Sequence, residues 1–326
     1  MRAQDLQGSK QRFVLHSNAL EGNLIGDSPD REVSVYLPPS YTKDTTKSYP
    51  VLYLLHGYTD SDSKWFGFEN HWINFPRLID SVITAGSCQE MIVVMPNAYN
   101  TFKGSFYSSS LTIGDWETFV TEELVTYIDD HYRTLASRDS RGLAGHSMGG
   151  YGTIRLGMKF PDIYSSIYLL SPCCMSTNSF DNDGLRKNTQ AVTQKEQIAD
   201  QPFFVSAALA LAAAWAPDPD KSPLFLDLPF DDGGSIDDIQ NKFAANAILN
   251  MVDQYIYNLT RLENIGMDAG MQDYGIHDDT RHLHEILDES GVNHLYESYE
   301  GNHVNKIAER ITRKMLPFFS ENLKFN

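Results

Sequence analysis

The sequence GHSMG at residues 145–149 constrains the fold of this chain more than any other feature. It follows a short apolar run at Leu143 and Ala144 and precedes a helix-like run over residues 151–160. A G-x-S-x-G sequence between a strand and a helix is typical of a nucleophile elbow, a sharp turn that exposes a serine above a sheet. The free N–H groups of the following helix can stabilise an oxyanion. We therefore interpret Ser147 as a nucleophile; the alternative is a glycine-rich turn that only joins two elements.

Strands alternate with amphipathic helices along the first half of the chain. The run VLYLL at 51–55 is apolar throughout, as strands inside a parallel sheet are, whereas 31–37 alternates as a half-buried strand does. Apolar residues at helical spacing lie between the strands. This order predicts an α/β fold, with a mostly parallel central sheet flanked by helices. The expected strands of this half lie at 31–37, 51–55, 91–95 and 167–170, and one precedes Ser147.

The alternation then stops, because residues 176–263 contain no run that resembles a buried strand. They contain an alanine-rich helical run over 205–216, an acidic loop over 231–238 and a helical stretch from 239 to about 262. We predict a single domain over residues 1–326 in which 176–263 form a helical insertion or cap; the alternative is a pair of outer helices with long loops. After the insertion we expect strands at 264–267 and 294–299 and helices at 277–289 and 304–319.

The chain is acidic, with 43 Asp and Glu against 26 Lys and Arg and a net charge of −17. A negative surface repels phosphate backbones, so we expect no nucleic-acid partner. No apolar run is long enough to span a membrane. The first 23 residues lack an apolar signal core, which favours the cytoplasm slightly over secretion after removal of a signal peptide. The three cysteines, Cys88, Cys173 and Cys174, do not suggest a disulfide framework, and we expect mostly buried thiols.

A serine becomes an effective nucleophile when a base, usually a histidine, accepts its proton. His303 is the best placed of the ten histidines, because it lies between the last expected strand and the last helix. Loops that follow parallel strands gather at one edge of a sheet, where Ser147 also lies. We therefore predict that His303 is the general base. The other histidines considered are placed in the elbow's scaffold (His146), in a structural position (His56) or outside the edge loops (His16, His71 and His131).

The third member of such a triad is a carboxylate in the loop after the preceding strand, where it orients the imidazole. Four aspartates lie in this region: Asp268, Asp273, Asp278 and Asp279. Asp273 lies in the loop itself, whereas Asp268 ends the strand. Asp278 and Asp279 begin the next helix, where acidic residues are favoured by the helix dipole alone. We predict Asp273 as the acid and keep Asp268 as the next candidate.

An oxyanion hole needs two N–H groups near the nucleophile. The N–H of Met148, directly after Ser147, is the first candidate. The second should come from the loop after the strand at 51–55, where Gly57 permits a tight turn that positions the N–H of Tyr58. We therefore predict that Tyr58 and Met148 form the oxyanion hole.

Two groups of residues suggest a metal site only weakly. His277, His282 and His284 lie close in sequence, but no H-x-x-x-H spacing places two of them on one helical face. The sequence DNDG at 181–184 resembles part of a calcium loop but lacks the glutamate ligand that such loops carry further on. We interpret both groups as surface residues. The chain also has no dinucleotide-binding or phosphate-binding glycine loop, so we expect neither a metal nor another cofactor.

Several motifs together resemble the esterase D-like branch of the α/β-hydrolases, which includes feruloyl esterases, S-formylglutathione hydrolases and mycolyltransferases. The resemblance covers nearly the whole chain. It implies an α/β-hydrolase fold, and it supports Asp273 as the acid, since the family's acid lies in a loop like GMQD at 270–273. The LHG entry that ends at Gly57 resembles the feruloyl esterase group. The other motifs are VYLPP at 35–39, GSFY at 104–107, GDWE at 114–117, AGHSMGG at 144–150 and GNH at 301–303.

These observations predict a serine carboxylesterase that hydrolyses short-chain or aryl, feruloyl-type esters through an acyl-enzyme. One alternative is an acyltransferase or an S-formylglutathione-type thioesterase with the same triad. An alternative of another class is an inactive hydrolase fold that only binds its ligand. The partner in each case is a small-molecule ester or its analogue. The residues expected to bind it are aromatic: Trp65, Phe203, Phe204 and Trp215.

Overall fold

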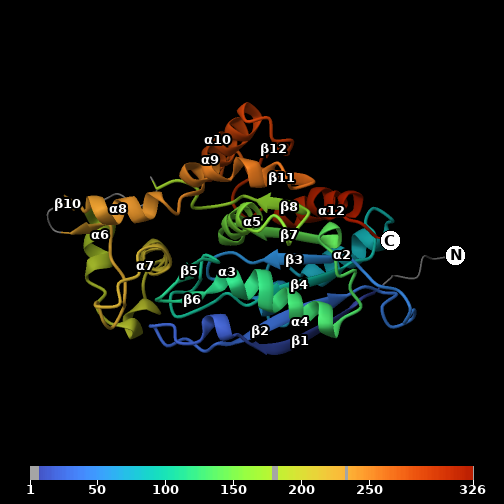
Figure 1. Ribbon diagram of the computed structural model, residues 1–326, viewed down its shortest axis with the longest axis horizontal. Helices are drawn as coiled ribbons and strands as arrows, with labels where there is room; N and C mark the ends of the chain where they lie inside the picture. The colour runs from blue at the N-terminus through green and yellow to red at the C-terminus, as the bar shows by residue number, and fades with distance from the viewer. Residues whose placement is uncertain (1–6, 178–182, 232–233, 326) are drawn as a thin grey trace.

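The computed structural model describes residues 7–177, 183–231 and 234–325, and a large central sheet runs through it (Figure 1). The sheet has eight strands in the order β1-β2-β4-β3-β7-β8-β11-β12. β1 and β2 are antiparallel to their neighbours, and every pair from β4 to β12 is parallel. The predicted α/β fold is therefore confirmed. The strands are Ser9–His16 (β1), Asp30–Leu37 (β2), Val51–Leu55 (β3), Ile92–Pro96 (β4), Arg141–His146 (β7), Ser166–Leu170 (β8), Asn264–Gly270 (β11) and Leu295–Tyr299 (β12).

Alternate residues of the strands enter two hydrophobic cores, one on each face of the sheet. Along β3, Val51, Tyr53 and Leu55 belong to the first core, and Leu52 and Leu54 to the second. This is the period of two that an extended strand imposes on its side chains. The first core is covered by Trp116–Thr118 (α3), Leu124–His131 (α4), Met148–Lys159 (α5), Ile248–Leu259 (α9) and Ile276–Glu289 (α10). The second is covered by Asp62–Trp65 (α1), Phe75–Thr84 (α2), Ile307–Arg310 (α11) and Leu316–Asn322 (α12).

Short elements join the larger ones. π-helical turns link α3 to α4 and α11 to α12, so the helix expected over 304–319 begins at Ile307 and is interrupted. These turns are Phe119–Glu123 and Ile311–Met315, and 3-10 turns lie at Asn18–Leu20, Arg138–Ser140 and Lys195–Ile198. The two-residue strands are Ser109–Ser110 (β5) with Gly114–Asp115 (β6), and Phe230–Asp231 (β9) with Gly234–Ser235 (β10).

The described residues of 176–263 are mainly helical. They form Asp183–Gln190 (α6), Phe203–Trp215 (α7), Asp237–Ala244 (α8) and α9. Helices α6, α7 and α8 lie at one end of the molecule, on the left in Figure 1, whereas α9 packs against α5. Every residue of α7 from Val205 to Trp215 is buried, which explains its many alanines, because small side chains let its neighbours approach on all sides. The role of this segment as an insertion or cap stays a prediction.

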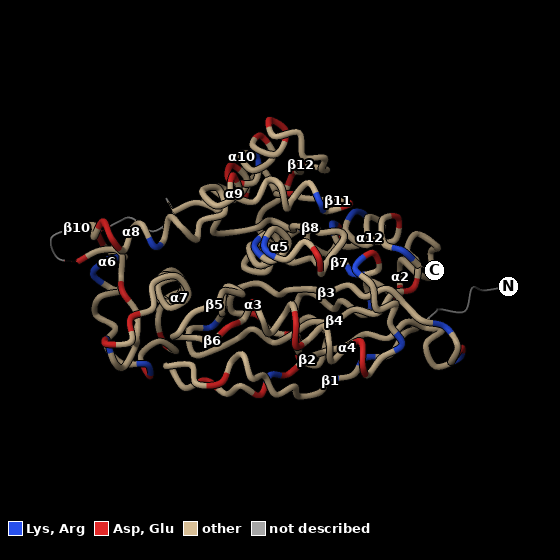
Figure 2. The backbone as a smooth tube through the Cα atoms, viewed as in Figure 1, with Lys and Arg blue, Asp and Glu red and all other residues tan. Residues whose placement is uncertain are grey.

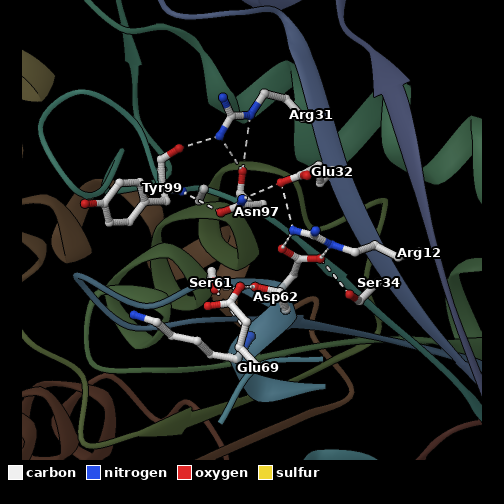
Figure 3. Close-up of polar contacts among 12 residues, drawn as sticks. Arg12, Arg31, Glu32, Ser34, Ser61, Asp62, Glu69, Asn97 and Tyr99 are labelled. Atoms are coloured by element: carbon white, nitrogen blue, oxygen red, sulfur yellow. Dashed lines mark hydrogen bonds and ion pairs between the residues drawn. The ribbon is translucent and has the colours of Figure 1, made fainter. Parts of the chain in front are cut away.

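The N-terminal region forms β1, where the sequence analysis expects no strand. β1 is an edge strand with β2 as its neighbour, so most of its side chains are exposed and it lacks the apolar run of a buried strand. β2 is more deeply buried than its alternating pattern predicts, because its polar side chains have partners. Ser34 Oγ donates to Asp62 Oδ2 at 2.6 Å, and Arg31 Nη2 donates to the carbonyl of Asn97 at 2.9 Å (Figure 3).

The helical stretch expected from 239 to about 262 is two helices, α8 and α9. The backbone of Ala247 between them is extended, with φ −73° and ψ 126°. No proline or glycine marks this break, so the local pattern does not reveal it. The break accompanies a tertiary contact, since the carbonyl of Asn246 accepts a hydrogen bond from the hydroxyl of Tyr151 at 2.9 Å.

Charged side chains are distributed widely over the chain. Figure 2 shows acidic residues along nearly every part of the described backbone, with basic residues between them. Many of these charges pair on the surface, where a single ion pair contributes about 0–1 kcal/mol to stability. Among the described helices, none is both long and apolar enough to cross a lipid bilayer.

Candidate active site

Ser147 occupies the turn between β7 and α5 in a left-handed backbone conformation, with φ 57° and ψ −116°. This conformation is costly for a residue with a side chain, and such strain is concentrated at functional sites. The two glycines of the motif make the turn possible. A Cβ atom on Gly149 would lie 2.0 Å from the carbonyl oxygen of Leu55, and one on Gly145 would lie 2.2 Å from the carbonyl oxygen of Gly149. Larger residues at either position would therefore clash with backbone.

Ser147, His303 and Asp273 lie within hydrogen-bond distance of one another in the order expected for a triad. His303 Nε2 lies 2.8 Å from Ser147 Oγ, and His303 Nδ1 lies 2.6 Å from Asp273 Oδ2. The carboxylate can only accept, so Nδ1 carries the proton and Nε2 is free to accept the serine hydroxyl. Ser147 and Asp273 are both buried, whereas a third of the His303 side chain is exposed.

The loops that carry Asp273 and His303 are bonded to each other. The N–H of Met271 donates to the carbonyl of Tyr299 at 2.8 Å, and the N–H of Gln272 donates to the carbonyl of Gly301 at 2.9 Å. These bonds continue the β11–β12 pairing beyond the ends of the strands. The parallel register of two neighbouring strands therefore brings the acid and the imidazole together, although 30 residues separate them.

Asp268, the other candidate acid, bonds elsewhere. It lies within β11, fully buried, where Oδ2 accepts hydrogen bonds from Arg310 Nε at 2.9 Å and from the hydroxyl of Tyr168 at 2.8 Å. Burial raises the pKa of Asp268 to about 6, while Arg310 acts in the opposite direction. Asp279 accepts from Ser176 Oγ at 2.7 Å, and Asp278 lies 3.6 Å from Arg281. Of the four aspartates, the structure places Asp273 against His303.

His146 lies beneath the imidazole of His303 and supports its backbone. Its Nε2–H donates to the carbonyl oxygen of His303 at 2.9 Å, and the two ring centroids are 4.7 Å apart. Burial lowers the pKa of His146 to about 3, so the ring is neutral at physiological pH. This position agrees with the expected scaffold role of His146.

The backbone N–H groups of Tyr58 and Met148 have no recorded acceptor within the described part of the chain. Met148 begins α5, where the N–H groups of the first turn have no intrahelical partner. Gly57 precedes Tyr58, and a Cβ atom on Gly57 would lie 3.5 Å from Ser147 Cβ, so this loop runs close to the serine. The carbonyl of Gly57 accepts a hydrogen bond from His56 Nδ1 at 2.8 Å. Since that carbonyl and the Tyr58 N–H belong to one planar peptide, His56 fixes the orientation of both.

A cleft of about 310 Å³ opens at Ser147. Its walls combine aromatic side chains with a polar group around Asp60. Asp60 Oδ1 lies 3.1 Å from His71 Nε2, and Asp60 Oδ2 accepts from Trp65 Nε1 at 2.8 Å. Lys64 Nζ donates to the carbonyl of Thr59 at 3.0 Å. The lining residues are Gly57, Tyr58, Thr59, Asp60, Lys64, His71, Trp72, His146, Ser147, Phe203, His303 and Val304.

A family model described as putative esterase matches residues 28–307, a range that includes Ser147, Asp273 and His303. This chain belongs to that esterase family. An esterase of Mycobacterium tuberculosis is 35% identical over 149 residues, which cover 44% of this chain and 29% of that protein. An endo-1,4-beta-xylanase/feruloyl esterase of Xylanibacter ruminicola is 33% identical over 168 residues, which cover 49% of this chain and 22% of that protein. The matched part is thus less than a third of either relative.

Solved structures resemble this esterase over nearly its whole length. A ferulic acid esterase superposes with a TM-score of 0.69 at 21% identity, covering 98% of this chain and 100% of the other. An S-formylglutathione hydrolase from Staphylococcus aureus superposes with a TM-score of 0.60 at 16% identity, again covering 98% and 100%. These similarities show that the esterase has the predicted α/β-hydrolase fold.

The cleft of the esterase has a different aromatic lining from the one expected. Trp65 is fully buried beneath the cleft and does not line it; Trp72, which is half exposed, lies there instead. Phe203 lines the cleft, but the neighbouring Phe204 is exposed outside it. Trp215 is buried and lines a separate cavity of about 30 Å³ with Phe230 and Phe243. The reason is that α7 is buried along almost its whole length, so only its first turn reaches the cleft.

Two residues of the cleft, His71 and Trp72, were not among the expected site residues. Both lie in the loop between α1 and α2, which precedes a helix rather than following a strand, so the strand-end rule does not select them. The available signal was a tryptophan in a polar stretch, ENHW at 69–72. An isolated aromatic residue among polar ones is more often a binding residue than part of a core.

The residues weighed as metal ligands are engaged with protein partners or lie outside the described residues. His277 Nε2 bonds Ser298 Oγ at 2.8 Å, and His284 Nδ1 bonds His294 Nε2 at 2.7 Å. Asp181 and Asn182 of the DNDG fragment are outside the described residues. Among those described, no group of three or more His, Cys, Asp or Glu side chains is arranged to hold a metal ion. The three cysteines are free thiols; Cys88 is buried, and Cys173 and Cys174 are partly buried.

Proposed function

We propose that this esterase is a serine carboxylesterase in which Ser147 forms an acyl-enzyme with the acyl group of the substrate. One observation carries the proposal: an unbroken chain of hydrogen bonds runs from Asp273 through His303 to Ser147, and the serine has a strained backbone at the base of a cleft. This arrangement matches the geometry by which a triad is recognised in unrelated serine hydrolases.

Each residue then has a defined role in two half-reactions. Ser147 Oγ attacks the ester carbonyl as its proton passes to His303 Nε2, and the N–H groups of Tyr58 and Met148 bind the oxyanion. His303 returns this proton to the departing alcohol, which leaves the acyl group on Ser147. Water then repeats the sequence, with His303 as its base, and releases the carboxylic acid. Asp273 holds the imidazole in the tautomer required for both steps and stabilises its protonated form.

We propose that the substrates are esters of short-chain or aryl carboxylic acids. The cleft volume of about 310 Å³ is at the lower end of the range for small-molecule sites, which suits a short acyl group or a single aromatic ring. Trp72, Tyr58 and Phe203 provide aromatic surface beside Ser147. The relative from Xylanibacter ruminicola and the structural neighbour described above are named for feruloyl or ferulic acid esters.

A fluorophosphonate probe tests whether Ser147 is activated. We expect the probe to label the native protein at Ser147, and labelling to be lost in Ser147→Ala, because an unactivated serine hydroxyl does not attack phosphorus at a useful rate. Intact-protein and peptide mass spectrometry locate the adduct. An unlabelled native protein would favour the alternative of an inactive fold that only binds its ligand.

The choice among substrates is tested with Phe203, which forms one wall of the cleft. We expect Phe203→Ala to raise the ratio of kcat/KM for hexanoyl over acetyl esters by about 10-fold, since each methylene in an apolar pocket contributes about 1–3 kcal/mol. Phe204→Ala is the matched control, because this neighbour is exposed and lies outside the cleft. The panel includes hydroxycinnamoyl esters, a thioester and an added alcohol, so that thioesterase and acyltransferase activity are measured directly. Equal profiles for the two variants would place the acyl pocket elsewhere.

A further inference from the structure

Residues 100–104, here called the brace, lie in the loop after β4 and contact both residues of the proposed oxyanion hole. Tyr58 follows β3, whereas Met148 begins α5, so the two N–H groups belong to different parts of the fold. An oxyanion hole is effective only when its donors are held at the distance that the oxyanion requires. Whatever holds these two parts at a constant separation therefore influences the rate.

The brace is hydrogen bonded to the Tyr58 loop at two points. The hydroxyl of Tyr58 donates to the carbonyl of Phe102 at 2.9 Å, and the N–H of Thr59 donates to the carbonyl of Lys103 at 3.1 Å. Thr59 has a φ of 66°, which is unfavourable for a residue with a branched side chain. The bond to Lys103 thus stabilises a backbone conformation that the loop would not favour by itself.

Gly104 fits between the two residues that supply the donors. A Cβ atom at this position would lie 2.6 Å from Met148 Sδ and 2.7 Å from Tyr58 Cδ2. The thioether of Met148 can rotate away. The ring of Tyr58 cannot, because its hydroxyl is bonded and its faces pack against Phe106 and Phe203, with centroids 5.9 and 5.5 Å away. A side chain at 104 therefore has to displace the Tyr58 loop from α5.

Asn100 determines the shape of the brace. Its side chain is buried, and its Oδ1 accepts the N–H groups of Phe102 and Gly104, each at 3.0 Å. Its carbonyl accepts the N–H of Lys103 at 2.8 Å, which closes a tight turn with Lys103 at φ 68°. Asparagine favours such turns because its side-chain oxygen can take the place of a backbone acceptor. Its Nδ2 has no partner, so the described contacts use only the oxygen.

The brace is attached to the sheet from the side of β2. The carboxylate of Asp27, just before β2, accepts the N–H of Thr101 at 3.1 Å and its hydroxyl at 2.7 Å. Arg31 in β2 donates to the carbonyl of Asn97 at 2.9 Å and to that of Tyr99, immediately before the brace (Figure 3). The brace therefore has a position that is defined by the sheet and does not follow the Tyr58 loop.

We propose that the brace sets the separation of the Tyr58 and Met148 N–H groups, and that Asn100 and Gly104 are positioning residues for the esterase reaction. The proposal rests on the proposed function, because it assumes that these two N–H groups bind the oxyanion. Neither residue touches the ester. Their effect appears where the oxyanion forms, in kcat, rather than in binding of the ground-state substrate.

A matched pair of glycine variants provides the test. In Gly104→Ala we expect kcat for p-nitrophenyl acetate to fall about 10²-fold with KM changed less than threefold, since a displacement of about 1 Å can cost that much. Gly142→Ala is the control. Its Cβ would lie 2.6 and 2.7 Å from ring atoms of Phe319, the same degree of overlap, but at the other end of β7 from the serine. We expect Gly142→Ala to lower Tm while kcat stays near the native value.

A second set of variants keeps the proposal testable if Gly104→Ala does not fold. Asn100→Ala removes the Oδ1 acceptor, and we expect it to lower kcat about 10-fold without changing KM, a smaller loss than that of a whole oxyanion-hole donor. Asn100→Asp retains an oxygen at this position and should restore most of kcat. A trifluoromethyl ketone, whose adduct with serine carries an oxyanion, should lose affinity in each variant in proportion to the loss of kcat/KM.

The outcomes separate this proposal from the proposed function. If the native protein is not labelled by the fluorophosphonate, the proposed function fails, and with it the premise of the brace. If the native protein is labelled and hydrolyses esters, but Gly104→Ala retains kcat as Gly142→Ala does, the brace alone is wrong. Equal loss of kcat in Asn100→Ala and Asn100→Asp would also contradict it.

Discussion

Replacing Ser147 or His303 by alanine should each lower kcat by several orders of magnitude, and the double variant should be little slower than either single one. The reason is that the nucleophile and its base act together: the 2.8 Å bond between Ser147 Oγ and His303 Nε2 is useful only when both groups are present. Steady-state hydrolysis of p-nitrophenyl acetate by all three variants measures this directly.

Two features make this comparison informative. His284→Ala serves as a control, because His284 also shares a hydrogen bond, with His294, but lies outside the cleft. We expect it to leave kcat unchanged. Losses that simply multiply in the Ser147 and His303 double variant would mean that these residues do not act as a pair, and would falsify the proposed triad.

Asp273→Asn should lower kcat by about 10⁴-fold, whereas Asp268→Asn should leave kcat close to the native value. An asparagine amide at 273 would donate to His303 Nδ1, which moves the remaining proton to Nε2. That nitrogen then faces the serine hydroxyl with a proton and cannot accept another. Circular dichroism should show that the Asp273 variant remains folded, so that the loss lies in the chemical step.

Asp268→Asn should instead lower stability. Asp268 and Arg310 form a buried ion pair at 2.9 Å, and removing one partner leaves the guanidinium without that compensation. Breaking a buried pair in this way costs about 3–5 kcal/mol, and we expect the lower end because Arg310 keeps its bond to Glu297 at 2.9 Å. Thermal unfolding and kcat, measured on both aspartate variants, distinguish the two roles. A reversal of the two results would assign the acid to Asp268.

Much of the fold could be predicted because local patterns report burial. The run at 51–55 is apolar throughout since both faces of β3 are covered, and the structure places alternate residues in the two cores. The elbow could also be located, because a serine with φ 57° between two close backbone contacts requires glycines at 145 and 149. Where burial is incomplete, as in β1, the pattern is weak and the strand was missed.

The candidate site follows the same division. Ser147, Asp273 and His303 could be selected because each follows a parallel strand, and the structure brings them within hydrogen-bond distance. The lining of the cleft could not. Trp65 and Trp72 are similar residues seven positions apart, yet one is buried and the other faces the cleft.

The sequence alone determined the order of strands and helices, the sharp turn at Ser147 and the loops that carry the other candidate residues, because these depend on side-chain periodicity and on conformations that few residues adopt. Only the tertiary structure decided which aspartate meets His303, which aromatic residues line the cleft and what holds Tyr58 against Met148. These depend on the packing of segments far apart in the chain, such as Gly104 against Tyr58 and Met148. No local pattern encodes such contacts, because each residue's environment there is supplied by other parts of the molecule.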